Sequence, residues 1–188
     1  MKATIATLVL CAVVIAIGCD VGLSEAQRAN NEGNSAHKAG QFEEAISLYT
    51  KAIELDPKLL SAHSNRGLLY WQMAKYDEAL TDLNQAVNLI TSTTPSSEAS
   101  GILGRRGGVY SDLKNYEKAI ADYDRAIRLY QNNAVIYHDR GRLYALLCDY
   151  DKAIAYLGHA VKLDKKYLDA YWLRRCVCEH KELFVGHR

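Results

Sequence analysis

The side chains best suited to bind a metal lie near the end of the chain, in Cys176-Val177-Cys178-Glu179-His180. Thiolates and imidazoles at short spacing are common zinc ligands. On a helix, Cys176 and His180 share one face at i and i+4, whereas Cys178 is turned away by about 200°. The three side chains cannot converge on one ion unless the helix unwinds, so no metal site is expected.

Catalytic groups are equally hard to assemble from this sequence. The six histidines are scattered at 37, 63, 138, 159, 180 and 187. There is no Ser or Cys nucleophile in a recognisable turn and no Gly-rich phosphate loop. The formal net charge is +1 and no basic stripe is present, so nucleic acid is not an expected partner. We therefore expect no enzymatic activity and no cofactor.

An Arg-Gly pair recurs three times, at 66–67, 106–107 and 140–141. It could be a row of anion receptors, but Asp82 and Asp122 also recur at matching places downstream. Pairing of each Arg with such an Asp would satisfy a half-buried guanidinium, which favours a structural role. Tyr156 takes the matching place in the last copy, so Arg140 needs another partner.

The elements that position these residues repeat along the chain. Glycines at 33, 67, 107 and 141 are separated by 34, 40 and 34 residues, and alanines at 45, 79, 119 and 153 keep the same intervals. An apolar stripe with helical spacing precedes Asp56-Pro57, where a helix must end. Second helices are predicted to begin at the corresponding positions Phe42, Tyr76, Tyr116 and Tyr150.

These units resemble tetratricopeptide repeats, whose signature is W-x2-L-G-x2-Y, then A-x3-F, then P. The third unit matches it at Leu103, Arg106, Gly107, Tyr110, Ala119, Tyr123 and Ala126. Arg replaces the signature Leu in units two to four, and the closing Pro survives only as Pro57. The resemblance implies an all-α fold, a right-handed superhelix of antiparallel helix pairs. Its domain spans 29–184, with repeats at about 26–59, 60–93, 100–133 and 134–167 and a capping helix at 168–184.

The repeated positions suggest how the units pack. Gly in a helix costs about 1 kcal/mol relative to Ala, so the glycines mark places where a second helix comes close, with its alanines as the natural partners. Tyr70, Tyr110 and Tyr144 are expected to fill the gaps between units. The Ser/Thr-rich stretch 90–99 contains the six extra residues of the long interval and is predicted to be a loop.

The N-terminus has the features of an export signal. Lys2 precedes an apolar run that ends at Ala16-Ile17-Gly18-Cys19, and this ending resembles a bacterial lipoprotein lipobox. The resemblance implies a signal peptide at 1–18, acylation of Cys19 and a tether at 19–28. The protein would then be anchored in the cell envelope, facing the periplasm or the exterior. The alternatives are a secreted protein and an uncleaved signal anchor.

Cys148, Cys176 and Cys178 would remain in the mature domain. Their odd number prevents complete pairing, although Cys148 could meet one of the other two in an oxidising compartment. Burial as small apolar side chains is the simpler expectation.

Binding is the function that remains. In the tetratricopeptide family the first helix of each unit lines a concave surface that holds another protein. The resemblance places a mixed set of residues on it: Asn30, Asn34, His37, Asn65, Leu68, Trp71, Arg105, His138, Arg142 and Trp172. Amides, aromatic rings and guanidinium groups suit a peptide. The expected function is an adaptor or scaffold that binds a protein or peptide.

Two other functions stay open. The module could instead self-associate as a homo-oligomer without a separate ligand. Asn34, Asn65 and Arg105 also match three of five positions of the carboxylate clamp by which some co-chaperones of this family hold acidic C-terminal peptides. Asn30 and Gly101 replace its two lysines, which removes much of the charge that selects a carboxylate.

Overall fold

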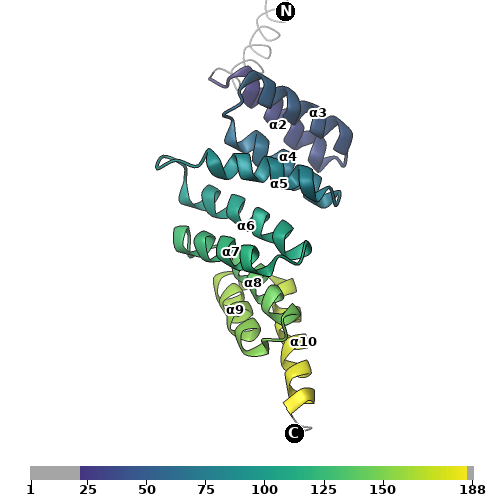
Figure 1. The fold of residues 1–188 in the computed structure, drawn as a ribbon, viewed down its shortest axis with the longest axis vertical. Coiled ribbons are helices and arrows are strands. Elements are labelled where there is room, and N and C mark those ends of the chain that lie inside the picture. The colour runs from purple at the N-terminus through teal and green to yellow at the C-terminus, as the bar shows by residue number, and fades with distance from the viewer. Residues whose placement is uncertain (1–21, 186–188) are drawn as a thin grey trace, which may run out of the picture. The chain divides into compact units, whose positions relative to one another are not determined.

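The computed structural model describes residues 22–185, with side chains to residue 181. The described residues form two compact units, one up to residue 62 and one from residue 63. The described part contains nine α-helices and no strand (Figure 1). The predicted all-α fold of antiparallel helix pairs is therefore confirmed. The predicted signal peptide and Cys19 lie outside the described residues.

The first unit contains helices α2 (Glu25–Lys38) and α3 (Phe42–Leu55), followed by the first residues of α4. Ala29 and Ala52 pack with Ala62 in its core, and Ile53 and Leu59 lie against them. As predicted, α3 begins at Phe42 and ends before Asp56 and Pro57, because Pro cannot continue a helix.

The second unit begins within α4 (Leu60–Gln72) and continues through six helices. They are α5 (Tyr76–Asn88), α6 (Ser96–Asp112), α7 (Tyr116–Leu129), α8 (Ala134–Leu146), α9 (Tyr150–Leu163) and α10 (Leu168–Val185). From α5 to α10, successive helices lie beside one another in chain order (Figure 1). The second helices α5, α7 and α9 begin at the tyrosines predicted from the repeat.

Two predicted boundaries are corrected. The stretch 90–99 is not all loop, because α6 begins at Ser96 directly after Pro95 and so takes up part of the long interval. Pro is well tolerated at a helix start, where its missing N–H would have no intrahelical partner. Helix α2 begins at Glu25, inside the predicted tether, because Ser24 and Gln27 form a capping box.

The repeated glycines lie against the facing helix, as predicted, although alanine side chains are not the nearest neighbours. A Cβ at Gly107 would lie 2.8 Å from the Tyr123 ring, and one at Gly67 would lie 2.9 Å from Leu83 Cγ. The close approach is therefore made by the large residue four positions after each alanine. Two tyrosines of the first helices lie between successive repeats as expected, since Tyr70 packs on a cluster that includes Val109 and Tyr144 packs in a cluster with Val177.

The last helix differs from the expected cap. Ala170 and Val177 of α10 are buried, whereas the apolar residues Leu168 and Trp172 are 76% and 69% exposed. Helix α10 packs on its neighbours through Ala170, Leu173 and Val177, whereas Leu168 and Trp172 face solvent. Arg175, which replaces Gly in the repeat, is exposed and pairs with Glu179 at 2.7 Å.

The three described cysteines are free thiols, and Cys148 is exposed, so the expectation of burial is wrong for that residue. Cys148 lies in the α8–α9 turn at a positive φ of 59°, which places its side chain outside the helix packing. Of the helices described between residues 22 and 185, none is long and apolar enough to cross a membrane.

Candidate functional site

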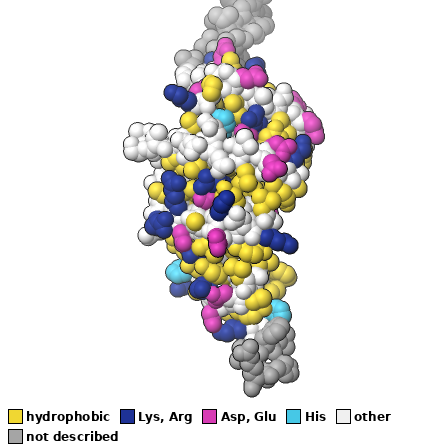
Figure 2. Space-filling view, in the orientation of Figure 1, with side chains coloured by type: hydrophobic (Ala, Val, Ile, Leu, Met, Phe, Trp, Pro, Cys, Tyr) yellow, Lys and Arg dark blue, Asp and Glu magenta, His cyan; other side chains and the backbone are white. Residues whose placement is uncertain are grey.

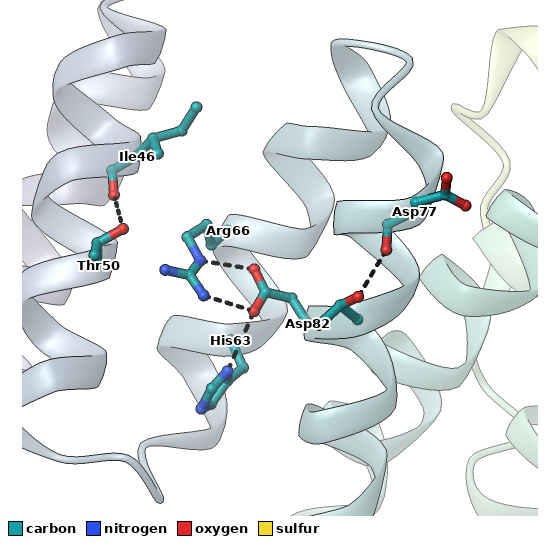
Figure 3. A network of polar contacts seen from close by, with 7 residues as sticks. Ile46, Thr50, His63, Arg66, Asp77 and Asp82 are labelled. Atoms are coloured by element: carbon teal, nitrogen blue, oxygen red, sulfur yellow. Dashed lines mark hydrogen bonds and ion pairs between the residues drawn. The ribbon is translucent and has the colours of Figure 1, made fainter.

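The repeated arginines form ion pairs with aspartates inside the fold, as the sequence predicted. Arg66 of α4 binds the Asp82 carboxylate of α5 through two nitrogens, at 2.7 and 2.8 Å, and His63 Nδ1 lies 3.4 Å from the same carboxylate (Figure 3). Burial raises the pKa of Asp82, but hydrogen bonds from Arg66 and His63 outweigh burial and hold that pKa below its usual value.

The same Arg-Asp pairing recurs in the next repeat. Arg106 binds Asp122 with two bonds of 2.7 Å and also donates to Asn84 Oδ1 at 2.9 Å. The hydrogen bonds from Arg106 to Asp122 raise the pKa of the guanidinium above its usual value. In the fourth repeat, Arg140 pairs with Asp124 instead, and its guanidinium lies 4.4 Å from the centre of the Tyr156 ring. These arginines are structural rather than a row of anion receptors.

A polar pocket of about 220 Å³ lies within the second unit, between the first helices α4 and α6. Asn65 and Arg105, two of the predicted binding residues, line it together with Ser64. Arg105 Nη1 donates to Ser64 Oγ at 2.6 Å and lies 3.5 Å from Asn65 Oδ1. The two first helices thus present an amide and a guanidinium to the same small space.

One face of α6 supplies most of the remaining lining. Glu98, Gly101 and Arg105 fall at i, i+3 and i+7, which places them along one side of the helix. Glu98 stands in the first turn of α6, where the helix dipole stabilises a negative charge. A Cβ at Gly101 would meet no atom within 4 Å, so this side of the pocket is open.

Trp71 is engaged within the fold rather than projecting freely toward a partner. Its Nε1 donates to Asp112 Oδ2 at 2.7 Å, and its ring lies where a Cβ at Gly108 would be, 2.2 Å from Cη2. The indole therefore joins α4 to α6. Leu68, on the same helix, is half-buried.

His138 and Arg142 lie on α8, away from Asn65 in the sequence. His138 Nδ1 is 3.2 Å from Asp139 Oδ1, and its ring centre is 4.9 Å from that of Tyr167. Burial, and then the charge of Asp139, raise the pKa of Tyr167 to about 12. Arg142 is half-buried, and its positive charge acts in the opposite direction on that pKa.

Of the remaining predicted binding residues, Trp172 lies on α10 and is exposed, and the other three belong to the first unit. Asn30 is buried, Asn34 Oδ1 accepts a hydrogen bond of 2.9 Å from the Tyr49 hydroxyl, and the His37 ring meets Phe42 edge-on at 6.0 Å. All three side chains therefore contribute to packing within this unit. Of the predicted set, the second unit brings Asn65 and Arg105 into one pocket.

Sequence reasoning missed Ser64, Ser97, Glu98 and Ile102 as lining residues. Glu98 and Ser97 lie inside the stretch 90–99 that was predicted to be a loop. The i, i+3, i+7 spacing of Glu98, Gly101 and Arg105 is the sequence signal that places them on one face of a helix beginning at Ser96.

The candidate metal ligands near the C-terminus, Cys176, Cys178 and His180, do not form a metal site in the part of the chain that the structure describes. The His180 ring is 5.7 Å from the ring centre of Tyr150 on α9. Among the residues that the structure describes, no group of three or more His, Cys, Asp or Glu side chains could hold a metal ion.

On the face shown in Figure 2, Lys and Arg side chains are interspersed with Asp and Glu rather than gathered in one basic stripe.

Antiparallel helix pairs in series, with polar side chains from successive first helices around a pocket, define an all-α helical-repeat protein. The tetratricopeptide repeat profile matches residues 58–132 and 98–166, and a TPR repeat profile matches residues 33–73. The chain belongs to the tetratricopeptide repeat family, whose domains are protein-interaction modules.

Individual relatives cover different parts of the chain. The Hsp70-Hsp90 organizing protein of Triticum aestivum is 44% identical over 62 residues, which is 33% of this chain and 11% of the relative. The chain spans 10–11% of the length of three such proteins from Triticum aestivum and Arabidopsis thaliana. It therefore corresponds to a small part of each.

Two solved structures illustrate the likeness of fold. The first TPR domain of Spaghetti (RPAP3), bound to the HSP90 peptide SRMEEVD, is 30% identical with a TM-score of 0.59, over 66% of this chain and 94% of that one. MamA is 23% identical with a TM-score of 0.67, over 85% of this chain and 84% of that one. The second likeness concerns the fold alone.

Proposed function

We propose that this protein is a non-enzymatic adaptor that holds a segment of another protein against the first helices of its repeats. The observation that carries this proposal is the convergence of Asn65 and Arg105 on one polar pocket between α4 and α6. An amide both donates and accepts hydrogen bonds, and a guanidinium donates several in a fixed plane. Such a pair can fix the position of a peptide segment.

The proposed site of action is the bacterial cell envelope. The lipobox-like sequence that ends at Cys19 supports this proposal. Acylation there would anchor the domain, because each buried methylene of a lipid contributes about 0.8 kcal/mol.

Cross-linking in native membranes, followed by mass spectrometry, tests the adaptor role. We expect Arg105→Ala to lose at least one partner that the unchanged protein captures. Arg125→Ala is the matched control, because Arg125 is an exposed residue of α7 that does not line the pocket. Identical partners in both variants would refute the assignment of the binding site.

An acidic C-terminal peptide is a second candidate ligand. The Spaghetti (RPAP3) domain that is 30% identical to this chain binds SRMEEVD, and Asn65 and Arg105 occupy places that resemble part of a carboxylate clamp. Fluorescence titration of the full chain with SRMEEVD is the direct test. A dissociation constant well above about 100 μM would leave less than 6 kcal/mol of binding free energy and reject this ligand.

Self-association is the third candidate. Leu168 and Trp172 of α10 are largely exposed, and large apolar side chains on one helix can pack on a second copy. Light scattering of the lipid-free domain tests this candidate, since a molar mass that stays monomeric at all concentrations would refute it.

A further inference from the structure

The pocket between α4 and α6 contains an acidic residue that faces the same space as the arginine. Among its described lining residues, Arg105 is the cation and Glu98 the anion. Both stand on one face of α6, seven residues or about 10 Å apart along the helix axis, and line the same cavity of about 220 Å³. The pocket is therefore dipolar rather than positive.

A carboxylate is a poor match for this arrangement. Arg105 would attract it, but Glu98, which lines the same pocket, would repel it, and salt screens such a charge effect only in part over short distances. Part of the guanidinium is also engaged, because Arg105 Nη1 donates to Ser64 Oγ at 2.6 Å and to the Ser64 carbonyl at 3.3 Å. Attraction and repulsion would largely offset each other.

An amide group matches both sides of the pocket. Its carbonyl oxygen can accept from the Arg105 guanidinium, and its N–H can donate to the Glu98 carboxylate or to Asn65 Oδ1. The absence of a side chain at Gly101 leaves room for the group between the two charges, since a Cβ there would meet nothing within 4 Å.

On the basis of the proposed function, we infer that Glu98 sets the charge preference of this pocket. The pocket accepts an amide from an internal segment of the partner and disfavours a C-terminal carboxylate. Glu98 is thus a residue that determines specificity, and its removal should open the pocket to anions.

The experiment compares two forms of one peptide on the full chain. SRMEEVD is titrated with a free C-terminal carboxylate and with a C-terminal amide. Exposed ion pairs contribute up to about 1 kcal/mol, so we expect Glu98→Gln to raise affinity for the free acid about two- to fivefold. Affinity for the amide form should stay the same, and Glu98→Lys should raise affinity for the free acid further.

Glu117→Gln is the matched control, because Glu117 is an exposed glutamate in the first turn of α7 and does not line this pocket. It makes the same charge change and should alter neither affinity. The gain from Glu98→Gln should also shrink as salt rises from about 0.05 to 0.5 M, because screening weakens a charge effect. A steric effect would persist at high salt.

The inference is overturned if Glu98→Gln changes both peptides equally or neither, or if Glu98→Lys still fails to bind the free acid. These results would leave the adaptor role intact, because that role is decided separately by the partners lost in Arg105→Ala.

Discussion

Asp82 shows how a single side chain can support two helices. It is a buried residue of α5, and its carboxylate accepts a hydrogen bond from Arg66 and lies beside His63, both of α4 (Figure 3). Removing one member of a buried ion pair leaves the other without its charge partner, which costs about 3 kcal/mol or more. The Arg-Asp pair is therefore a structural element of the repeat rather than a ligand site.

We expect Asp82→Asn to lower the free energy of unfolding by about 3 kcal/mol at pH 7, measured by urea denaturation. Because the pKa of Asp82 is lowered in the folded protein, its contribution is present above the unfolded value of about 3.9. It is lost as pH falls through the folded pKa. The difference between the two proteins should therefore shrink below about pH 4.

Asp77→Asn is the control for that prediction. Asp77 is exposed in the first turn of the same helix, so its replacement should change stability by less than about 1 kcal/mol. An equal loss in the two variants would mean that general charge, and not the pairing of Asp82, is responsible.

Two equivalent tyrosines have different hydrogen bonding. The Tyr49 hydroxyl donates to Asn34 Oδ1 at 2.9 Å, whereas the buried Tyr123 hydroxyl has no hydrogen-bond partner among the described residues. Gly108 occupies the place of Asn34 in that unit and supplies no side chain. Burial, followed by the charge of Asp139, raises the pKa of Tyr123, so its hydroxyl stays protonated.

Replacing each tyrosine by Phe should separate the two cases. We expect Tyr49→Phe to lower the free energy of unfolding by about 1 kcal/mol, because Asn34 loses a donor. Tyr123→Phe should be neutral or stabilising, because it removes a buried hydroxyl without a partner. Urea denaturation of both variants provides the comparison, and an equal loss in both would contradict the assignment.

Helix α6 approaches its neighbours through positions that have no side chain. A Cβ at Gly108 would lie 2.2 Å from Trp71 Cη2, and one at Gly104 would lie 2.0 Å from Ile136 Cδ1. Gly101, on the pocket side of the same helix, has free space around it. One helix thus contains glycines required by packing and a glycine that packing does not require.

We expect Gly108→Ala to destabilise the protein by about 1–3 kcal/mol, because the Trp71 ring must move. Gly101→Ala is the matched substitution on the same helix and should stabilise by up to about 1 kcal/mol through helix propensity. Thermal unfolding gives the two signs, and tryptophan fluorescence should shift in Gly108→Ala. Stabilisation by Gly108→Ala would show that the indole does not depend on this contact.

For the chain as a whole, the proposed lipid anchor gives a clear expectation. Cys19→Ser should move the protein from the membrane fraction to the released fraction, because the acyl chain would be lost. Fractionation followed by immunoblotting measures the change, with Cys148→Ser as the control for loss of an exposed thiol. Retention of Cys19→Ser in the membrane would favour an uncleaved signal anchor.

The sequence by itself determined the repeat and hence the fold. Glycines, alanines and tyrosines at intervals of 34 and 40 residues predicted where the second helices begin. The sequence also predicted the pairing of Arg66 with Asp82 and of Arg106 with Asp122. These features were predictable because packing of successive repeats restricts the same positions in each unit.

Only the tertiary structure decided which exposed residues share a site. Whether Trp71 meets a ligand or Gly108 depends on how α4 and α6 pack, because these residues are remote in sequence and local periodicity does not encode their contact. Whether Glu98 shares a helix face with Arg105 depends on where α6 begins. The structure shows that Asn65, Glu98 and Arg105 line one pocket, whereas the binding role of the wider set of groove residues stays a prediction.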